Sequence, residues 1–454
     1  MTRARAALLL GLLPLVLAAI VVRAEGPLYV GGPPQSATFA DGIPNSVPGL
    51  PFRWDPTQFP LSYWTDQGSL GTLTKAPADA LVQQAFQVWQ DVPTASISFS
   101  KAGDLGANVG ASNPPSGLRS GILSVQDALY DCSTLPGDPA GGVAKPRTVI
   151  YDNSLGSILI ALGEDPNSTL GFADALCLSG DGVNNFFNRS YAVLNGKFTG
   201  TALGRTDLQA VMIHEFGHMI GLDHSQINLD CLSLFRCSDD ALQGLPTMFP
   251  ILVDGTAMST PAADDIAGLS ELYPDPTFAT TTGRITGHIL FSDGVTPAQG
   301  FNVVVRQVDN TLTAQDESKI IAVSNASGYL FTEDAGNALL QLSGLTPSPF
   351  GSRNSSLIGL FNIPGLPPGN YTVEVEAIDT SFVGGSGIGP IGALGFEFPM
   401  PGTCATELWN NAESANDLCD TSTPITVTAG STTTGINIIL NGTPPRYDAW
   451  EDGP

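Results

Sequence analysis

The chain has 454 residues with 18 Lys or Arg and 43 Asp or Glu, which gives a formal net charge of −25 at pH 7. This charge argues against partners that are themselves anionic, so we expect no binding to nucleic acid or to an anionic membrane surface. The length exceeds that of one ordinary core and predicts two domains, while the abundant glycine (51) and proline (35) predict more loops and short strands than helix.

Residues 1–24 have the pattern of a secretory signal peptide. Arg3 and Arg5 precede an apolar run over residues 6–22, and small residues suitable for cleavage follow it. An uncleaved membrane anchor is the alternative that this pattern leaves open. After cleavage we expect a secreted protein without stable membrane insertion. It would begin with a linker or N-terminal arm over residues 25–50, where Gly, Pro and Ser are frequent.

Three helices and several short strands are predicted up to residue 276. The first helix spans residues 77–90, where apolar side chains share one helical face and Pro77 suits the first turn. The second carries the histidine-rich motif, and Thr206 can cap it and form a capping box with Gln209. The third starts near residues 260–261. Short strands are expected at residues 96–99, 148–151 and 191–194.

The pattern changes after residues 277–282, which are expected to be a linker. From Gly283 onward, short alternating strands separated by turns are typical of a β-sandwich, here over residues 283–442. Within it, a Gly/Pro-rich insertion at residues 380–424 is expected to lie outside the sandwich core as a loop stapled by a disulfide. Residues 443–454 form an acidic tail.

The six cysteines are an even number in a chain expected to be exported, and none lies in a C-x-x-C pair. They therefore indicate disulfides rather than a zinc framework. Pairing near neighbours gives Cys231 with Cys237, Cys404 with Cys419, and by remainder Cys132 with Cys177. Other connectivities stay open at this point, because spacing alone does not determine them.

Three of the four histidines lie in one short stretch, HEFGHMIGLDH, from His214 to His224. On a helix, His214 and His218 project from the same face, so both imidazoles can bind one zinc ion at about 2.0–2.1 Å. Gly221 allows a left-handed turn out of the helix, which lets His224 return as the third ligand. Glu215 lies about 100° around the helix from the first ligand and would flank the metal without binding it.

Three neutral imidazoles leave one coordination position for water, which marks a catalytic rather than a structural zinc site. Zinc would lower the pKa of that water and polarise a scissile carbonyl. Glu215 would take the proton of the water and pass it to the leaving amine. The predicted activity is hydrolysis of protein or peptide substrates without a covalent intermediate.

The stretch HEFGHMIGLDHS resembles the zinc motif of the metzincin clan, and specifically that of the matrixin (matrix metalloproteinase-like) family. In PTMFP, Met248 resembles the methionine of the turn beneath the zinc. The segments ALVQQAFQVWQ, ADDIAGLSELYP and STLGFADA are similar to the first helix, the last helix and the segment before the substrate-binding edge strand. The resemblance implies an α+β catalytic domain over residues 51–276, with a twisted sheet and three main helices, in which Glu215 is catalytic and His214, His218 and His224 hold zinc.

The chain departs from the matrixin pattern in ways that affect regulation and specificity. No cysteine switch precedes the catalytic region, because the first cysteine is Cys132, and the histidines of a second, structural zinc are absent. The stretch from His224 to Met248 is longer than in compact matrixins and borders the expected S1′ pocket, so substrate preference does not transfer. Structural calcium is a further expectation, with loop carboxylates as candidate ligands: Asp152, Asp174 and Asp181.

The segments GRITGHIL and GLPPGNYTVEV resemble carboxypeptidase regulatory-like (prealbumin-like) β-sandwich domains, and they imply an all-β, prealbumin-like or Ig-like fold for the second domain. His288, in its first strand, is expected at the surface or an edge. By analogy this domain positions, stabilises or binds, which suggests an extracellular or cell-surface ligand. The alternative function is therefore a surface binding or adhesive protein whose sandwich is the main functional part. If the sandwich is accessory, a chain ending near Asp275 should still fold and cleave small peptides.

Overall fold

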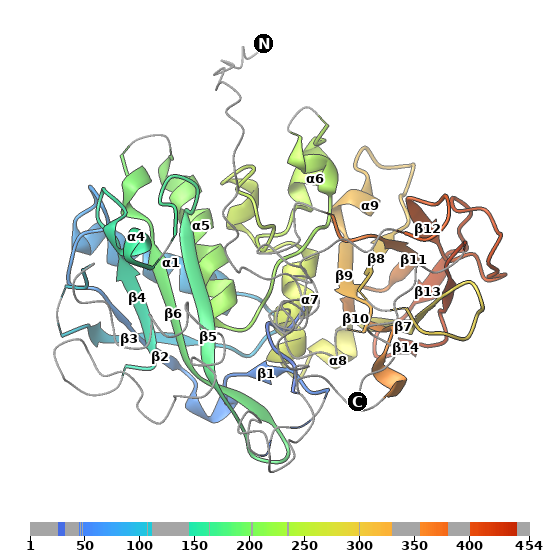
Figure 1. Ribbon diagram of the computed structural model, residues 1–454, viewed down its shortest axis with the longest axis horizontal. Coiled ribbons are helices and arrows are strands. Elements are labelled where there is room, and N and C mark those ends of the chain that lie inside the picture. Colours follow the sequence, from blue (N-terminus) through green and yellow to red (C-terminus); the bar gives the residue numbers. More distant parts are fainter. Residues whose placement is uncertain are drawn as a thin grey trace, which may run out of the picture.

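The computed structural model describes residues 26–31, 45, 47, 49–106, 108–110, 145–162, 164–200, 203–233, 236–298, 300–328, 355–379 and 400–442. The predicted signal peptide and acidic tail lie outside these ranges, as do most of the N-terminal arm and Cys132. We call the described residues up to 282 the N-terminal unit and those from 283 onward the C-terminal β unit (Figure 1). In the described ranges no helix combines the length and apolarity needed to cross a membrane.

The N-terminal unit is built on a six-stranded, mostly parallel sheet. Its strands are β1 (Phe52–Arg53), β2 (Leu61–Thr65), β3 (Phe99–Asp104), β4 (Arg147–Tyr151), β5 (Gly171–Gly180) and β6 (Asn185–Leu194). The order is β1-β6-β4-β2-β3, and β5 pairs with β6 in antiparallel register, from Gly171 opposite Leu194 to Gly180 opposite Asn185. The antiparallel strand thus lies at an edge of the sheet, beside helix α5 in Figure 1.

Three longer helices accompany this sheet: α1 (Lys75–Gln90), α5 (Arg205–Met219) and α7 (Ala263–Leu272). Helices α1 and α5 are joined by stacked rings of Phe86 and Phe216, 4.1 Å apart, and by a hydrogen bond from Trp89 Nε1 to Ile213 O of 2.8 Å. Both helices contribute to one buried apolar cluster with the sheet. This packing confirms the expected apolar faces and holds α5 rigidly against the sheet.

Several predicted boundaries are wrong. Helix α1 begins at Lys75 rather than Pro77, and β6 spans Asn185–Leu194 rather than residues 191–194 alone. Helix α5 begins at Arg205, so the predicted cap Thr206 lies inside the helix. The Asp207 carboxylate accepts the Gly204 N–H at 2.8 Å, and the Thr206–Gln209 capping box does not form. Helix α7 begins at Ala263, two residues after the predicted start. The strand predicted at residues 96–99 lies at Phe99–Asp104 instead. In α5 and α7 an aspartate at the third helical position accepts the backbone N–H of the residue before the helix. Apolar periodicity does not reveal such a cap.

The remaining helices are short. They are η1 (Pro56–Gln58), α4 (Ser157–Leu162), η2 (Gly196–Phe198), η3 (Leu229–Leu232), α6 (Asp239–Gln243), η4 (Ala257–Ser259), α8 (Phe278–Thr281), α9 (Glu317–Ile320) and η5 (Ser355–Leu357). Helix α8 falls within the residues expected to be a linker, and Phe278 is buried there. The connection between the two units is therefore a packed segment rather than an extended spacer.

The C-terminal β unit contains two separate sheets. One contains β7 (Gly283–Leu290), β10 (Leu360–Leu366), β14 (Thr432–Thr433) and β15 (Ile438–Ile439), and the other contains β8 (Asn302–Gln307), β9 (Ala322–Ala326), β11 (Gly369–Glu376), β12 (Thr406–Leu408) and β13 (Ile425–Val427). In the first sheet β7 pairs antiparallel with β10 but parallel with β14 and β15, whereas the second sheet is antiparallel throughout. Side chains of β7 alternate between buried and half-buried, and one apolar cluster contains residues of both sheets. This arrangement is compatible with the predicted β-sandwich.

The described part of the insertion at residues 380–424 contributes to this unit, contrary to its expected place outside the core. Strand β12 pairs with β11, with Leu408 opposite Glu374, and Met400 and Trp409 pack against the shared apolar cluster. The disulfide between Cys404 and Cys419 is present as predicted. The insertion therefore extends the sheet as well as carrying a staple.

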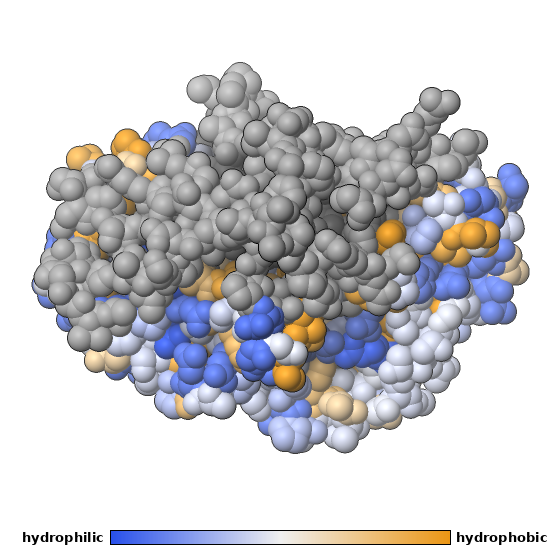
Figure 2. All heavy atoms as spheres, turned by 60° about the horizontal axis from the view of Figure 1, so that its bottom comes forward, coloured by the Kyte–Doolittle hydropathy of each residue, from blue (hydrophilic) through white to orange (hydrophobic). Residues whose placement is uncertain are grey.

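Disulfides also join Cys231 with Cys237, in the segment between His224 and Met248. Cys177 is disulfide-bonded as well, and the residue left to pair with it, Cys132, lies outside the described ranges. Hydrophilic residues predominate over the described part of the face shown in Figure 2, with apolar residues scattered among them.

Helix α7 packs closely against β10, because a Cβ added at Gly365 would lie 2.6 Å from Ala267 Cβ. Gly365→Ala should lower the free energy of unfolding by about 1–2 kcal/mol through its positive φ, and by about 1–3 kcal/mol more through this contact. Gly435→Ala is the matched control, since Gly435 has a similar φ (+77°) and no atom within 4 Å of its added Cβ. Urea denaturation of both variants should show the difference; equal losses would contradict the close packing.

Candidate metal centre

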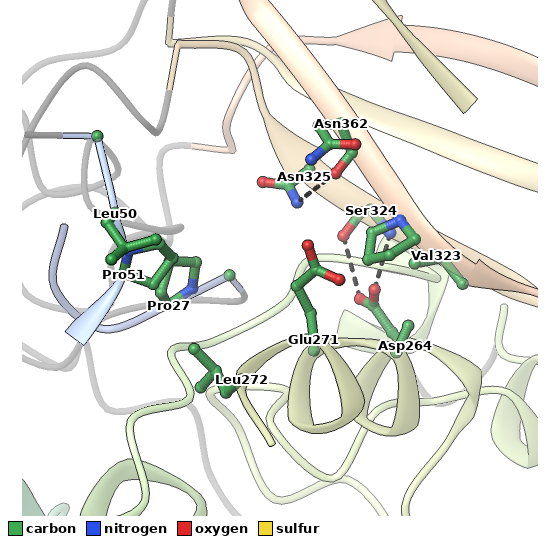
Figure 3. Close-up of a pocket in the computed structure, with 15 residues that line it drawn as sticks. Pro27, Leu50, Pro51, Asp264, Glu271, Leu272, Val323, Ser324, Asn325 and Asn362 are labelled. Atoms are coloured by element: carbon green, nitrogen blue, oxygen red, sulfur yellow. Dashed lines mark hydrogen bonds between the residues drawn. The ribbon is translucent and has the colours of Figure 1, made fainter. Parts of the chain in front are cut away.

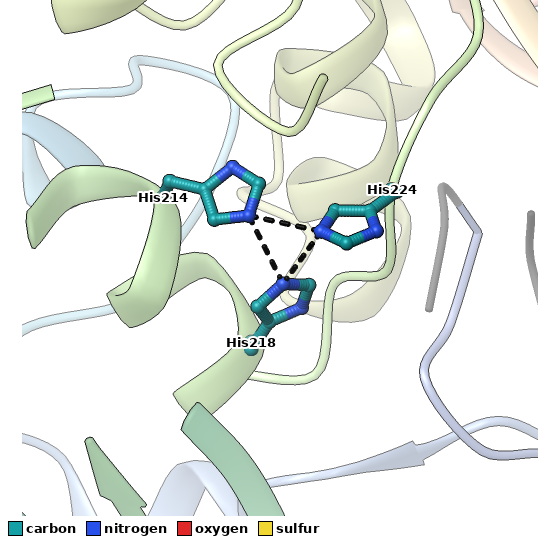
Figure 4. A group of neighbouring side chains, drawn as sticks. All are labelled: His214, His218 and His224. Carbon is teal, nitrogen blue, oxygen red and sulfur yellow. Dashed lines mark hydrogen bonds between the residues drawn. The ribbon is translucent and has the colours of Figure 1, made fainter. Parts of the chain in front are cut away.

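The structure brings together the three histidines that the motif predicts. His214 Nε2 lies 2.9 Å from His224 Nε2 and 3.2 Å from His218 Nε2, and the third distance is 3.1 Å (Figure 4). His214 and His218 come from α5, and His224 follows a turn at Gly221, whose φ is +95°. Gly221 thus has the left-handed conformation that the sequence analysis expected at this position.

The turn that carries His224 is held from two directions. Leu222 N–H donates to Gly217 O of α5 at 3.0 Å, and the N-terminal arm adds two backbone bonds, from Leu28 N to Gly221 O (2.8 Å) and from Asp223 N to Gly26 O (3.2 Å). The described start of the arm is therefore part of the site rather than a free linker. The backbone around the third ligand is consequently held in place on both sides.

The hydrogen bonds of the imidazoles define their protonation. Nδ1 of His214 lies 2.8 Å from Thr247 O and Nδ1 of His218 lies 2.9 Å from Leu222 O. Because a carbonyl oxygen only accepts, each Nδ1 must carry the proton and donate it. Burial lowers the pKa of His214 to about 4, and burial followed by the other two histidines lowers that of His224 well below its ordinary value. Neutral rings with protonated Nδ1 atoms present lone pairs at Nε2.

His214 and His218 carry their protons on Nδ1, so only His224 could place a proton on its Nε2. At most one proton is therefore available for the three close contacts between Nε2 atoms. The contact between His214 and His218 brings two lone pairs together in a buried site, which is unfavourable unless a cation lies between them. Three nitrogens bound tetrahedrally to one zinc ion at 2.0–2.1 Å would lie about 3.3–3.4 Å apart, close to the observed spacing. The triad can therefore bind a metal ion. Its nitrogen donors suit zinc and also other first-row divalent cations.

Met248 packs directly on α5. A Cβ added at Gly217, the residue before His218, would be 2.3 Å from Met248 Sδ. The Asp265 carboxylate accepts the N–H groups of Thr247 (2.8 Å) and Met248 (3.0 Å). Because Thr247 O accepts the His214 proton, Asp265 orients a ligand through the turn.

Glu215 directly follows His214 on α5, and only 6 % of its surface is exposed. Its carboxyl group packs against Gly171, the first residue of β5, where an added Cβ would be 2.5 Å from Glu215 Oε1. Burial raises the pKa of Glu215 to about 8. A cation bound nearby would oppose this shift, because positive charge favours the carboxylate.

The three candidate calcium ligands are not brought together. Asp152 accepts the backbone N–H groups of Ile158 and Leu159, Asp174 accepts the Tyr29 hydroxyl at 3.1 Å, and Asp181 accepts backbone N–H groups of its own turn. Among the described residues, the histidine triad is the only group of three or more potential ligands close enough to share a metal ion. His288 lies on β7 outside the triad, with Nε2 3.1 Å from Ser356 O.

Sequence reasoning missed several residues that shape this site, namely Gly171, Thr247 and Asp265. Asp265 had a partial signal, since an aspartate near a helix start is a common cap. It indeed accepts the Ala262 N–H at 2.6 Å. Nothing local in the sequence indicates its second task, which is to hold the turn at Thr247.

No protein-family model matches the chain, and no curated protein is detectably similar to it in sequence. The assignment of the site therefore depends on its own geometry.

Metal binding should stabilise the fold, because a cation removes the repulsion between buried lone pairs. Zinc at roughly a thousandfold excess over its dissociation constant should raise the free energy of unfolding by about 4 kcal/mol. His218→Ala should lose most of this effect, since two imidazoles hold zinc poorly. Thermal unfolding with zinc and with a chelator measures it, and an equal zinc response in both proteins would contradict the ligand set.

Proposed function

We propose that this chain is a secreted zinc-dependent endopeptidase of the matrixin-like, metzincin type, acting on protein or peptide substrates. The observation that carries the proposal is the convergence of three imidazole Nε2 atoms, with a buried glutamate, Glu215, next to the first of them on the same helix. A closed structural site has four protein ligands, whereas this group offers three and leaves a position for water. The flanking matrixin-like segments favour a peptide over other hydrolysable substrates.

In this proposal the histidines bind the metal and Glu215 transfers protons. His214, His218 and His224 would hold the metal, with two ring orientations set by backbone carbonyls. Zinc in this position supplies a water of lowered pKa and polarises the substrate carbonyl. The Glu215 carboxylate accepts the proton of the attacking water and delivers it to the leaving amine nitrogen.

Strand β5 supports recognition of a peptide main chain. Among the described residues it pairs with β6 alone, so its other edge offers backbone groups for an extended substrate. Gly171, where β5 begins, contacts Glu215, which places the start of this edge next to the proton-transfer group. A substrate strand added to β5 would therefore be directed past the triad.

The proposal is tested by zinc analysis of the purified mature chain together with a peptide-library cleavage profile. We expect one zinc ion per chain, and endoproteolytic cleavage that a chelator abolishes and added zinc restores. Cleavage that persists in the metal-free protein would contradict the mechanism. The profile also gives the substrate preference. This preference cannot be transferred from matrixins, because the segment from residue 225 to 247 is longer here than in compact members of that family.

Glu215→Ala should keep the fold and the zinc but lose peptidase activity by about 10²–10⁴-fold, because proton transfer is removed. The kcat and the zinc content of the variant are compared with those of the parent chain. Retained activity, within about threefold of the parent, would be incompatible with general-base catalysis by this residue. His214→Ala is a useful contrast, since it should lose the zinc as well.

Gly171→Ala should reduce kcat while zinc binding is preserved, since the added Cβ must displace the Glu215 carboxyl group. A displacement of this size at a proton-transfer group costs on the order of 10²-fold. Gly171 does not ligate the metal, so zinc content serves as the internal control. Unchanged kcat would mean that the position of Glu215 against β5 is not needed for catalysis.

A further inference from the structure

The segment directly after the third ligand is buried against the C-terminal β unit. Ser225, Gln226, Ile227 and Asn228 are each at most 2 % exposed. Three of these residues use their side chains to reach the β unit, directly or through Asp264. A segment next to a metal ligand is thereby packed against a part of the chain that lies far away in sequence.

Gln226 makes the most specific of these contacts. Its Nε2 donates to Glu376 Oε1 at 2.6 Å and to Ala377 O at 3.0 Å, and its Oε1 accepts the Asp379 N–H at 3.1 Å. Glu376 Oε1 is held in turn by Asn302 Nδ2 at 2.9 Å. The last residue of β11 and the residues after it therefore form hydrogen bonds with both polar atoms of the Gln226 side chain, two residues from His224.

Asp264 connects the same segment to β9. Its carboxylate accepts the Ser225 hydroxyl at 2.6 Å, the Ser324 N–H at 2.7 Å and the Ser324 hydroxyl at 3.0 Å. Figure 3 shows the Asp264–Ser324 contact beside a cavity of about 200 Å³ where the N-terminal arm, α7 and the β unit meet. Helix α7 thus joins the ligand segment to the β unit.

Ile227 and Asn228 also contact the β unit. They belong to the loop between His224 and Met248, which borders the expected S1′ pocket. Ile227 packs with Val304 and Ala322, and Asn228 Nδ2 donates to Lys319 O at 2.8 Å. A Cβ added at Gly244 would lie only 2.0 Å from Lys319 O, so the two backbones touch. The loop therefore rests on α9 and the strands beside it.

We propose that the C-terminal β unit is an integral part of the metal centre, in which Glu376 and Asp264 act as positioning residues for the segment that carries His224. This rests on the proposed function only in that the triad binds a metal. It differs from the expectation of an independent accessory domain, because buried hydrogen bonds to Gln226 are lost when the β unit is removed or displaced. Partners that orient metal ligands commonly change metal affinity when they are substituted.

The test compares substitutions at neighbouring positions of β11 in the full-length mature chain. Glu376→Ala removes one of the two acceptors of Gln226 Nε2, the one at the shorter distance, whereas Val375→Ala removes core apolar volume from the same strand without touching that contact. Burial, followed by Glu374, raises the pKa of the Glu376 carboxyl, so neutral Glu376→Gln is the conservative replacement. The readouts are zinc affinity, by competition with a chromogenic chelator, and the visible spectrum of the cobalt-substituted protein.

Glu376→Ala should weaken zinc binding by about tenfold or more and alter the cobalt spectrum. The zinc affinities of Glu376→Gln and Val375→Ala should stay within about threefold of that of the parent, and both variants should keep the parental cobalt spectrum. Equal weakening by Glu376→Ala and Val375→Ala would overturn the proposal, as would parental affinity in Glu376→Ala. If Glu376→Ala does not fold, Ser324→Ala takes its place, and parental zinc affinity in that variant overturns the proposal.

The outcome is separable from that of the proposed function. Zinc affinity and the cobalt spectrum do not require peptide hydrolysis. A parent chain that binds zinc but cleaves no peptide would refute the endopeptidase and leave the positioning role to be decided by the variants. A parent chain that binds no zinc would overturn both.

Discussion

The structure depends on one constraint, which is that three imidazoles, two buried and one half-buried, bring their Nε2 atoms to a common point. Two of the rings cannot turn away, because Thr247 O and Leu222 O hold their Nδ1 protons. The carbonyls are fixed in turn, one by the turn that Asp265 caps and the other by the backbone after Gly221. The fold thus maintains an arrangement that is electrostatically unfavourable until a cation is bound, which is a form of preorganisation.

The fold supports this constraint from three sides. Helix α5 is anchored to α1 through stacked rings and a tryptophan hydrogen bond. The N-terminal arm ties down the turn before His224, and the C-terminal β unit ties down the segment after it. The parallel sheet contributes mainly through its antiparallel edge, where Gly171 leaves room for the Glu215 carboxyl group.

The sequence predicted the parts of this site that are local. The spacing of His214 and His218 and the glycine at 221 are enough to converge three rings, because helix geometry and a left-handed turn depend on neighbouring residues alone. The start of α5 was misplaced, since Gly204 caps through its backbone and has no side chain to recognise. Contacts between residues far apart in sequence, such as Gln226 with Glu376, leave no periodic or spacing signal.

The same limit explains the differences in the β unit. Alternating apolar residues identified its long strands, but the three residues of β12 are too few to show a period. The predicted linker contained one buried aromatic, Phe278, whose partner surface is assembled only by the complete fold. Short elements and interfaces are thus the parts that depend on tertiary context.

The separation between Gln226 and its partners also has a consequence for the order of events during synthesis. The residues that hold the segment after His224 lie 150 to 153 positions further along the chain. During synthesis the helix with His214 and His218 therefore emerges long before the third ligand can be fixed. Contacts of such long range form late in folding, because the intervening chain must first be ordered. The segment that carries His224 would in this way reach its final position only after the chain has been made as far as Asp379.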